Sequence, residues 1–586
     1  MKFLRNVLST VVGVFLSIIL LFIFFFAFMA IVSAIGGDGT VKVKEKSILK
    51  LDLDRLIKDH AYAVSPFEES FGFADPTMGL DDIVQAIEYA ETDERIKGIS
   101  IQDGFVIAGI AQTKAIRDAL LKFKESGKFI YAYGDFYSQK DYYLGSAADS
   151  IFINPQGEMD FRGLSSEVIY LKDLQEKSGI KMEVIRHGKY KSAVEPFLEN
   201  EMSEANREQI SVFLQSIWNE MLAEIGDSRS LSTQQLNEIA DELGARSPEL
   251  AIENRIIDGV SYMDEYEALL RKASDIEEDD DLRMVSIKDY IKKAKPDTDL
   301  DASKIAILYA QGEIMYAKGD EDIIGQVTMT KAIRKIKEDE DIKAVVLRVN
   351  SPGGSALASE LIWREIELLK EEKPVIVSMG NVAASGGYYI ACNADKIVAE
   401  PTTITGSIGV FGTLPNLKGL ADKIGMNAEQ VGTNERASGY SLFEPLSDDF
   451  RSYVKEGIED IYSTFLKRVA DGRGMTVAEV DSIAQGRVWA GTDAIKNGLV
   501  DELGGLDVAL KLAAEAADLE EYRTVDYPKF KKDFFQELSA SPLAKAKEKM
   551  IKEEIGDEAY EVLHRLKAIS RQKGIQARLP FEINIK

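Results

Sequence analysis

The sequence predicts an α/β protein in which a domain with largely parallel strands is used twice, behind an N-terminal transmembrane helix. Residues 133–163 match residues 379–409 without a gap, pairing for example Tyr142 with Tyr388. In each half, short apolar runs typical of buried strands alternate with helical patterns. An uncharged, densely apolar stretch stands at the N-terminus. Together these features indicate a duplicated domain that is tethered to a membrane.

The apolar stretch is long enough to cross a membrane. No charge occurs in residues 6–37, and residues 11–34 are densely apolar. A helix of that length, at about 1.5 Å per residue, exceeds the roughly 30 Å of a hydrocarbon core. The alternative is a cleaved secretory signal, because residues 32–34, Val-Ser-Ala, resemble a cleavage site. Apolar regions of signal peptides run only about 7 to 15 residues, which favours the anchor.

The flanking charges favour a cytoplasmic N-terminus. Lys2 and Arg5 precede the stretch, and positive residues concentrate on the cytoplasmic side of transmembrane helices. Lys42, Lys44 and Lys46 follow it and weaken this asymmetry. We therefore expect the bulk of the chain on the outer side of the membrane.

The remaining chain is too long for a single core and divides into two domains. A polar segment, residues 293–303, fits a linker between them. We place the N-terminus and anchor at residues 1–40, the first domain at 41–295 and the second domain at 296–586.

Both domains are expected to place their elements in the same order. In the second half the predicted strands and helices cover residues 305–309, 344–349, 355–370 (helix), 375–379, 385–393 (helix) and 396–399. In the first half they cover residues 47–53, 98–101, 112–124 (helix) and 129–133. One loop differs: Pro352-Gly353-Gly354 of the second half is replaced by residues 105–108, Phe-Val-Ile-Ala, in the first.

Composition excludes some functions. There are 71 Lys and Arg against 98 Asp and Glu, giving a net charge of -27, which argues against nucleic acid and broad adhesion to anionic lipid. The single cysteine, Cys392, rules out an internal disulfide and sits in a pattern typical of a packed helix. Neither a metal nor a nucleotide cofactor is expected, because the chain has three scattered His and no phosphate-binding loop.

Ser385 is a candidate nucleophile. It lies in Ala-Ala-Ser-Gly-Gly at a predicted strand-to-helix turn, where the N–H of Gly386 would face an anion. Gly353 and Gly354 end the preceding strand and could supply a second N–H, completing an oxyanion hole. The simpler interpretation of each motif is a tight turn that needs glycine. In the first half Gln139 stands opposite Ser385, so that half lacks the nucleophile.

The base is less obvious. None of His60, His187 and His564 lies in the serine-bearing core; we expect His60 and His564 at the surface and keep His187 as a weak alternative. A lysine can act as a base if burial lowers its pKa. Lys191 precedes the small, apolar run Ser-Ala-Val, but Lys189 would share its orientation on a strand, so these arguments prefer neither.

A family resemblance resolves this choice. Residues 352–354, 383–389 and 405–409 resemble the signal peptide peptidase A family (protease IV), and the tandem length with residues 190–197 resembles its long, duplicated bacterial form. The resemblance implies a Clp protease/crotonase fold used twice, with Ser385 as nucleophile and Lys191 as general base. It also implies a bowl-shaped homotetramer with inward-facing active sites.

The expected function is therefore a single-pass, membrane-anchored serine endopeptidase that degrades remnant signal peptides. We expect it in a bacterial inner membrane, with its catalytic domains on the periplasmic side. Ser407 and Ser192 are candidates for orienting the lysine. Two alternatives stay open: a crotonase-like acyl-CoA enzyme, which gives no reason for the anchor or for a Ser–Lys pair, and an inactive membrane-tethered scaffold. The intact glycine motifs of the second half argue against the scaffold.

Overall fold

The computed structural model describes most of the chain: residues 2–35, 43–62, 77–102, 105–277, 280–294, 302–437, 439–530, 556 and 575–578. The predicted linker falls largely outside the described residues. So does the predicted domain boundary at residues 295 and 296. His564 lies outside them as well.

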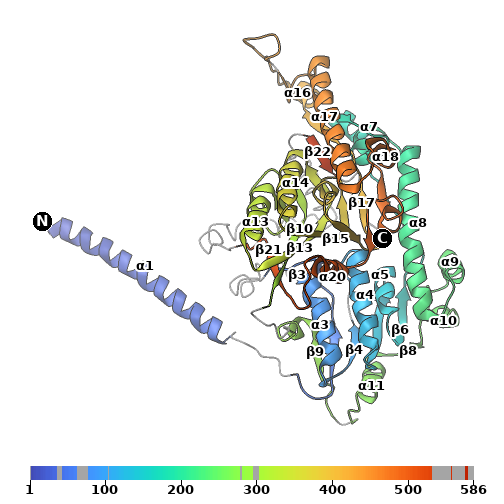
Figure 1. Ribbon diagram of the computed structural model, residues 1–586. Helices are drawn as coiled ribbons and strands as arrows, with labels where there is room; N and C mark the ends of the chain where they lie inside the picture. Colours follow the sequence, from blue (N-terminus) through green and yellow to red (C-terminus); the bar gives the residue numbers. More distant parts are fainter. Residues whose placement is uncertain are drawn as a thin grey trace.

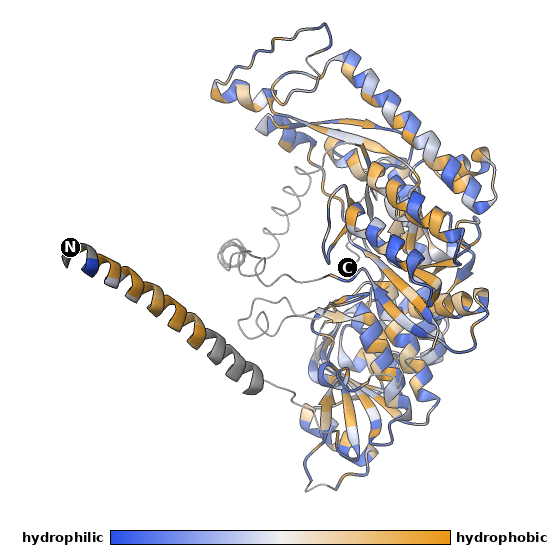
Figure 2. Ribbon diagram, turned by 60° about the vertical axis from the view of Figure 1, so that its left-hand side comes forward, coloured by the Kyte–Doolittle hydropathy of each residue, from blue (hydrophilic) through white to orange (hydrophobic). Residues whose placement is uncertain are grey.

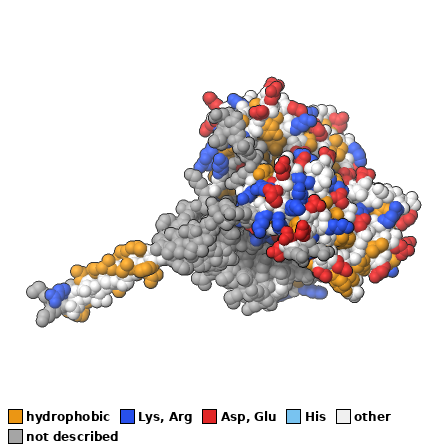
Figure 3. Space-filling view, turned by 90° about the horizontal axis from the view of Figure 1, so that it is seen from below, with side chains coloured by type: hydrophobic (Ala, Val, Ile, Leu, Met, Phe, Trp, Pro, Cys, Tyr) orange, Lys and Arg blue, Asp and Glu red, His pale blue; other side chains and the backbone are white. Residues whose placement is uncertain are grey.

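The N-terminal segment is one helix, α1 (Lys2–Ile35), of 34 residues. Among its described side chains, apolar ones such as Phe15 (67% exposed) and Leu21 (72% exposed) face outward. Figure 1 shows the helix extending away from the body, and Figure 2 shows its apolar character. In Figure 3 its largely apolar surface contrasts with the interspersed acidic and basic side chains of the body. By length and composition it could cross a membrane.

Each half builds a sheet of the same design. The first has the order β8-β6-β5-β4-β1-β9 with every pair parallel. The second has the order β19-β17-β15-β13-β10-β21, with β16 beside β15 and β20 beside β16, and only β19 antiparallel. The strands are β8 (Gly259–Val260), β6 (Ser150–Met159), β5 (Phe129–Tyr137), β4 (Ile96–Gln102), β1 (Ser47–Leu51), β9 (Met284–Ser286), β19 (Val488–Ala490), β17 (Ile404–Gly406), β15 (Val375–Ala384), β13 (Ile342–Ser351), β10 (Lys304–Gln311), β21 (Arg523–Tyr527), β16 (Lys396–Ala399) and β20 (Glu502–Leu503).

Helices cover these sheets, so strand residues such as 344–349 of β13 are all buried and almost all apolar. After α1, the longest helices in the described part of the chain are α8 and α17, which have 26 residues each and begin at capping serines, Ser203 and Ser447. The helices are α3 (Leu80–Thr92), α4 (Ile110–Lys124), α5 (Gln139–Gly145), α6 (Lys172–Ser178), the 3₁₀ turn η1 (Ser192–Val194), α7 (Glu195–Leu198), α8 (Glu204–Arg229), α9 (Thr233–Asp241), α10 (Pro248–Glu253), α11 (Met263–Ala273), α12 (Ile287–Tyr290), α13 (Gln326–Glu338), α14 (Ala356–Lys370), α15 (Gly386–Ala391), α16 (Lys418–Ile424), α17 (Asp448–Arg473), α18 (Val477–Ile483), α19 (Gly491–Ala494) and α20 (Leu506–Ala516).

Strand β15 is longer than the sequence predicts. The sequence predicts that this strand ends at Met379, but in the structure it continues to Ala384. The strand changes partner on the way: residues 376–379 pair with β16, and residues 382–384 pair with β17. Because the second pairing holds the chain extended as far as Ala384, the next residue, Ser385, lies at the C-terminal end of β15.

A third sheet joins the two halves. Its order is β12-β11-β14-β22-β18-β7, and β7 comes from the first half whereas the other strands come from the second. β7 pairs antiparallel with β18 over its whole length, from Lys181↔Asn416 to Arg186↔Phe411. These strands are β12 (Ile323–Gly325), β11 (Glu313–Met315), β14 (Gly353–Ser355), β22 (Ile575–Arg578), β18 (Phe411–Asn416) and β7 (Lys181–Arg186), and a separate pair is β2 (Leu56–Lys58) with β3 (Thr77–Gly79). This sheet carries the end of β7 to the second half.

The halves also share buried contacts. Asp59 of the first half pairs with Arg348 of β13 at 3.0 Å, and both side chains are 2% exposed. The apolar core of the first half includes Ala384 and Val488 from the second. The two halves therefore pack as one body.

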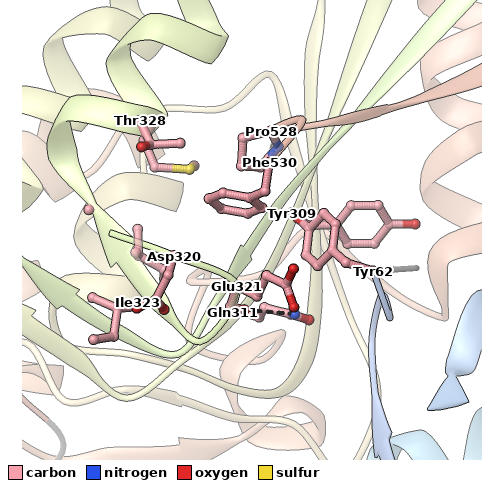
Figure 4. A pocket seen from close by; sticks show the side chains of 12 residues that line it. Tyr62, Tyr309, Gln311, Asp320, Glu321, Ile323, Thr328, Pro528 and Phe530 are labelled. Carbon is pink, nitrogen blue, oxygen red and sulfur yellow. Dashed lines mark hydrogen bonds between the residues drawn. The ribbon is translucent and has the colours of Figure 1, made fainter. Parts of the chain in front are cut away.

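His60 corrects an expectation, because it does not lie at the surface. Its Nδ1 is 2.7 Å from Asp81 Oδ2, and its ring stacks on Tyr309 of the second half. Burial lowers the pKa of His60, but the hydrogen bond and charge of Asp81 outweigh it and raise that pKa. The adjoining cavity, lined by Tyr62, Tyr309 and Gln311 (Figure 4), has a volume of about 10 Å³, which suits about one water molecule rather than a ligand.

Candidate active site

Ser385 sits at the turn between β15 and α15 in a strained backbone conformation. Its φ of 55° and ψ of -114° are unusual for a residue with a side chain. The Ser385 N–H donates to Gly406 O (2.8 Å), and Ser385 O accepts from the Tyr389 N–H (2.8 Å). These bonds to β17 and α15 hold the backbone of Ser385 on both sides.

Lys191 reaches the second half because β7 carries it there. The chain leaves β7 and runs against residues 485–486, where the Tyr190 N–H donates to Gln485 O (2.8 Å). Gly486 has a φ of +82°, and a Cβ on it would lie 2.6 Å from the Lys191 N atom. A Cβ on Gly409 would lie 3.3 Å from Lys191 Cδ. Two glycines of the second half thus make room for a lysine of the first.

The amine of Lys191 contacts two serines. Its Nζ lies 2.8 Å from Ser385 Oγ, 2.9 Å from Ser407 Oγ and 3.0 Å from Ser407 O. Lys191, Ser385 and Ser407 are all fully buried. Burial holds the pKa of Lys191 well below its usual range.

A neutral amine, with two N–H bonds and one lone pair, can make all three contacts. Ser407 O can only accept a hydrogen bond, so one N–H points to it. The second N–H can be accepted by Ser407 Oγ. The lone pair is then left for the proton of Ser385 Oγ. In this arrangement Ser407 orients the amine and Ser385 presents its proton to it.

The predicted oxyanion glycines surround the turn. The position that a Cβ on Gly353 (φ +95°) would take lies 2.6 Å from Gly386 N, so these two glycines are in direct contact. Gly354 packs on the other side, where a Cβ would lie 2.1 Å from Ile314 O. The Gly353 N–H donates to Ser351 Oγ (3.2 Å). The three glycines add no side chains of their own beside Ser385.

The other candidates do not reach the serine. Lys189 is exposed, with Nζ 5.0 Å from the centre of the Tyr190 ring. The Ser192 hydroxyl contacts Tyr190 O (3.2 Å) and Gln209 Nε2 (3.0 Å) rather than the lysine amine. His187 contacts Glu459 (2.6 Å), and its ring stacks on Tyr462. Of the two candidates for orienting Lys191, Ser407 contacts the amine and Ser192 does not.

The corresponding place in the first half is filled by the chain's own side chains. The Gln139 side chain accepts from the N–H of Gly163 (2.8 Å) and donates to Gly163 O (3.2 Å). Asp141, which matches Gly387, accepts from the N–H of Val106 (2.8 Å) in the loop that replaces Pro-Gly-Gly. A carboxylate thus already occupies a backbone donor of that loop.

Sequence reasoning missed two groups that shape the site. One is the pair of residues Gln485 and Gly486, and the other is strand β22, which lies beside the glycines of β14. Gly486 is one of 44 glycines in the chain, and nothing in its neighbourhood marks it. Cys392, as expected, is fully buried, and burial raises the pKa of its thiol to about 12.

Comparison with known proteins identifies the class of molecule. Residues 122–277 and 367–520 match peptidase family S49, one segment in each half. The chain belongs to this family, which confirms the resemblance and the tandem duplication, and the protein is a serine peptidase.

Named relatives agree. The chain is 36% identical over 535 residues to Protease 4 of Haemophilus influenzae, covering 88% of this chain and 85% of that protein. It is 37% identical over 525 residues to Protease 4 of Salmonella typhi, covering 86% and 84%. To the chloroplastic serine protease SPPA of Arabidopsis thaliana it is 36% identical over 449 residues, covering 75% and 66%.

Two solved structures are similar to part of the chain. A ClpP1 variant from Listeria monocytogenes has 15% identity and a TM-score of 0.23, covering 34% of this chain and 91% of that one. A variant of the 1510-N membrane-bound stomatin-specific protease, in complex with a substrate peptide, has 16% identity and a TM-score of 0.27, covering 41% and 98%.

Proposed function

We propose that this serine peptidase is a membrane-anchored endopeptidase that uses Ser385 as nucleophile and Lys191 as general base to degrade remnant signal peptides. The observation that carries the proposal is the 2.8 Å contact between Lys191 Nζ and Ser385 Oγ in a fully buried site. Burial lowers the pKa of the amine and so favours its neutral form, which is the form that can remove a proton.

Acylation follows from the geometry. Lys191 takes the proton of Ser385 Oγ, and the oxygen attacks the substrate carbonyl carbon. The negative charge that develops on the carbonyl oxygen is stabilised by the backbone N–H groups near Gly353, Gly354 and Gly386. The Lys191 ammonium then gives its proton to the leaving amine, and the peptide bond breaks to leave an ester on Ser385.

Deacylation repeats the proton transfer with water. Neutral Lys191 removes a proton from a water molecule, which attacks the ester, and the ammonium returns a proton to Ser385 Oγ. In both steps the ammonium form exists without a carboxylate partner. Ser407 offsets part of that cost, because both of its oxygens accept from the amine.

Helix α1 and the named relatives support the proposed substrate and location. Helix α1 would place the peptidase at a membrane, where cleaved signal peptides remain. A relative carries the name SPPA, and the chain covers 66% of it. A periplasmic location of the catalytic domains and a homotetrameric assembly remain predictions that follow from the family resemblance.

A serine-directed acylating probe tests the proposal. We expect the full-length protein in detergent to be labelled and to hydrolyse an apolar signal-like peptide. Both properties should be lost in Ser385→Ala, and in Lys191→Ala labelling should be much slower. Lys189→Ala is the matched control, because it removes a neighbouring lysine that is exposed. Full labelling of Ser385→Ala would move the nucleophile elsewhere.

A further inference from the structure

A segment of the chain itself lies in the proposed active site. Strand β22 pairs antiparallel with β14 on one side, in the register Gly354↔Ala577, and with β18 on the other, in the register Phe411↔Gln576. β14 contains two of the three proposed oxyanion glycines. β22 therefore takes the place in the sheet that an extended peptide substrate would take by strand addition.

The carbonyl of Ala577 lies beside the proposed oxyanion donors. The position of a Cβ on Gly353 would be 2.2 Å from Ala577 O and 2.6 Å from Gly386 N, and a Cβ on Gly386 would be 3.0 Å from the same oxygen. The Ala577 oxygen thus sits between the two glycines next to Ser385. This is where the carbonyl of the bond to be cut must lie.

The side chains of β22 also fit as those of a bound peptide. Ala577 is 1% exposed, so the residue whose carbonyl faces the glycines is small and fully enclosed. Ile575, on the same face of the strand, lines a cavity of about 510 Å³ with apolar residues of α17 such as Val454. On the other side of the carbonyl, Arg578 pairs with Glu313 of β11 at 3.5 Å. Side chains on both sides of the bond are thus held.

We propose that Ile575–Arg578 is an internal substrate and that the enzyme cleaves its own Ala577–Arg578 peptide bond. The inference rests on the proposed function. Ser385 Oγ attacks the Ala577 carbonyl carbon while Lys191 takes the Ser385 proton. The bond to the Arg578 nitrogen breaks, that nitrogen receives the proton from Lys191, and residues 578–586 leave. Water then hydrolyses the Ala577 ester, giving a carboxylate at Ala577 and restoring Ser385.

Intact-mass spectrometry of the full-length protein in detergent tests this step. We expect the wild type to lose residues 578–586 over time and Ser385→Ala to keep them. Ala577→Phe should slow the loss by about a hundredfold, because the enclosed side chain has no room for a ring. Ala516→Phe, at an exposed position of α20, is the matched control and should process at the wild-type rate.

Hydrolysis of an external apolar peptide, measured in the same samples, separates the two proposals. A wild type that hydrolyses the external peptide but keeps residues 578–586, or is cut at another bond, overturns the internal substrate and leaves the proposed function standing. Equal processing of Ala577→Phe and wild type also overturns it. A wild type that cuts neither substrate overturns the proposed function itself.

Discussion

The amine of Lys191 lies 2.8 Å from the hydroxyl of Ser385, although 194 residues separate them in the chain. The two residues come from opposite halves of a duplication, and the contact forms within one chain. Strand β7 makes it possible, because its pairing with β18 carries the first half into the second. The interface between the halves thus positions both side chains.

The pair should act as a unit. We expect Ser385→Ala and Lys191→Ala each to lower kcat by about a thousandfold or more, and the double variant to be no worse than either. Steady-state hydrolysis of a fluorogenic peptide measures this. Independent, additive losses would contradict a shared proton transfer. Lys189→Ala should keep most of the activity.

The activity should fall as the pH falls, with lysine as the titrating group. Lys191 must be neutral, and burial lowers its pKa, so the acid limb of kcat/KM should report that lowered pKa. A pH–rate profile measures the limb. His187→Gln should leave the limb in place, since His187 contacts Glu459 rather than the serine. A limb that moves with His187→Gln would assign the base to histidine.

Stability should depend on pH through the same residue. The pKa of Lys191 is lower in the folded chain than in the unfolded chain, so between these two pKa values the unfolded chain binds more protons. Wild-type stability therefore gains with rising pH in that window, up to about pH 10.4. Lys191→Met lacks the group, so its Tm relative to wild type should fall across the window. A Tm difference that does not change with pH would mean that folding does not lower the pKa of Lys191.

Ser407 should act by positioning the amine. Both of its oxygens contact Lys191 Nζ, so Ser407→Ala removes one contact and leaves the carbonyl. We expect kcat to fall by about tenfold to a hundredfold with little change in KM, and the acid limb to shift. Ser192→Ala is the control, because Ser192 does not contact the amine. A larger loss in Ser192→Ala would reverse the assignment.

Gly486 should be essential for the site because it packs directly against Lys191. A Cβ there would lie 2.6 to 2.7 Å from the backbone and Cβ of Lys191, so Gly486→Ala must displace the lysine. Gly474→Ala is a matched control: it has a similar φ of +64°, but its Cβ would meet nothing within 4 Å. Both variants should lose some stability to backbone strain. Only Gly486→Ala should lose about a hundredfold or more in kcat/KM.

Much of the site could be predicted because its residues sit in local motifs. A strand, a small-residue turn and a helix follow each other around Ser385, and the repeat makes the missing serine at Gln139 visible. Choosing Lys191 over Lys189 needed the family resemblance, because the sequence suggested a strand on which both would share an orientation. In the structure β7 ends at Arg186, before either lysine. The structure distinguishes them physically: Lys191 is enclosed and Lys189 is exposed.

Long-range pairing is what the sequence could not indicate. The short strand β22 has no periodicity that assigns it to β14 and β18, since its place depends on edges that other elements leave open. His60 was expected at the surface for a similar reason. Its partner Asp81 is close in sequence, but the ring of Tyr309 that covers it belongs to the other half.

The crossing of β7 into the second half also sets when Lys191 of a newly made chain can reach Ser385. Lys191 leaves the ribosome long before Ser385, and β18, on which β7 docks, is made later still. β7 therefore cannot dock, and Lys191 cannot reach its position, until β18 in the second half has been synthesised. Because one polypeptide supplies both groups, every finished chain holds them in equal number. With Ser385 and Lys191 as the proposed catalytic pair, a partly synthesised chain would therefore be inactive.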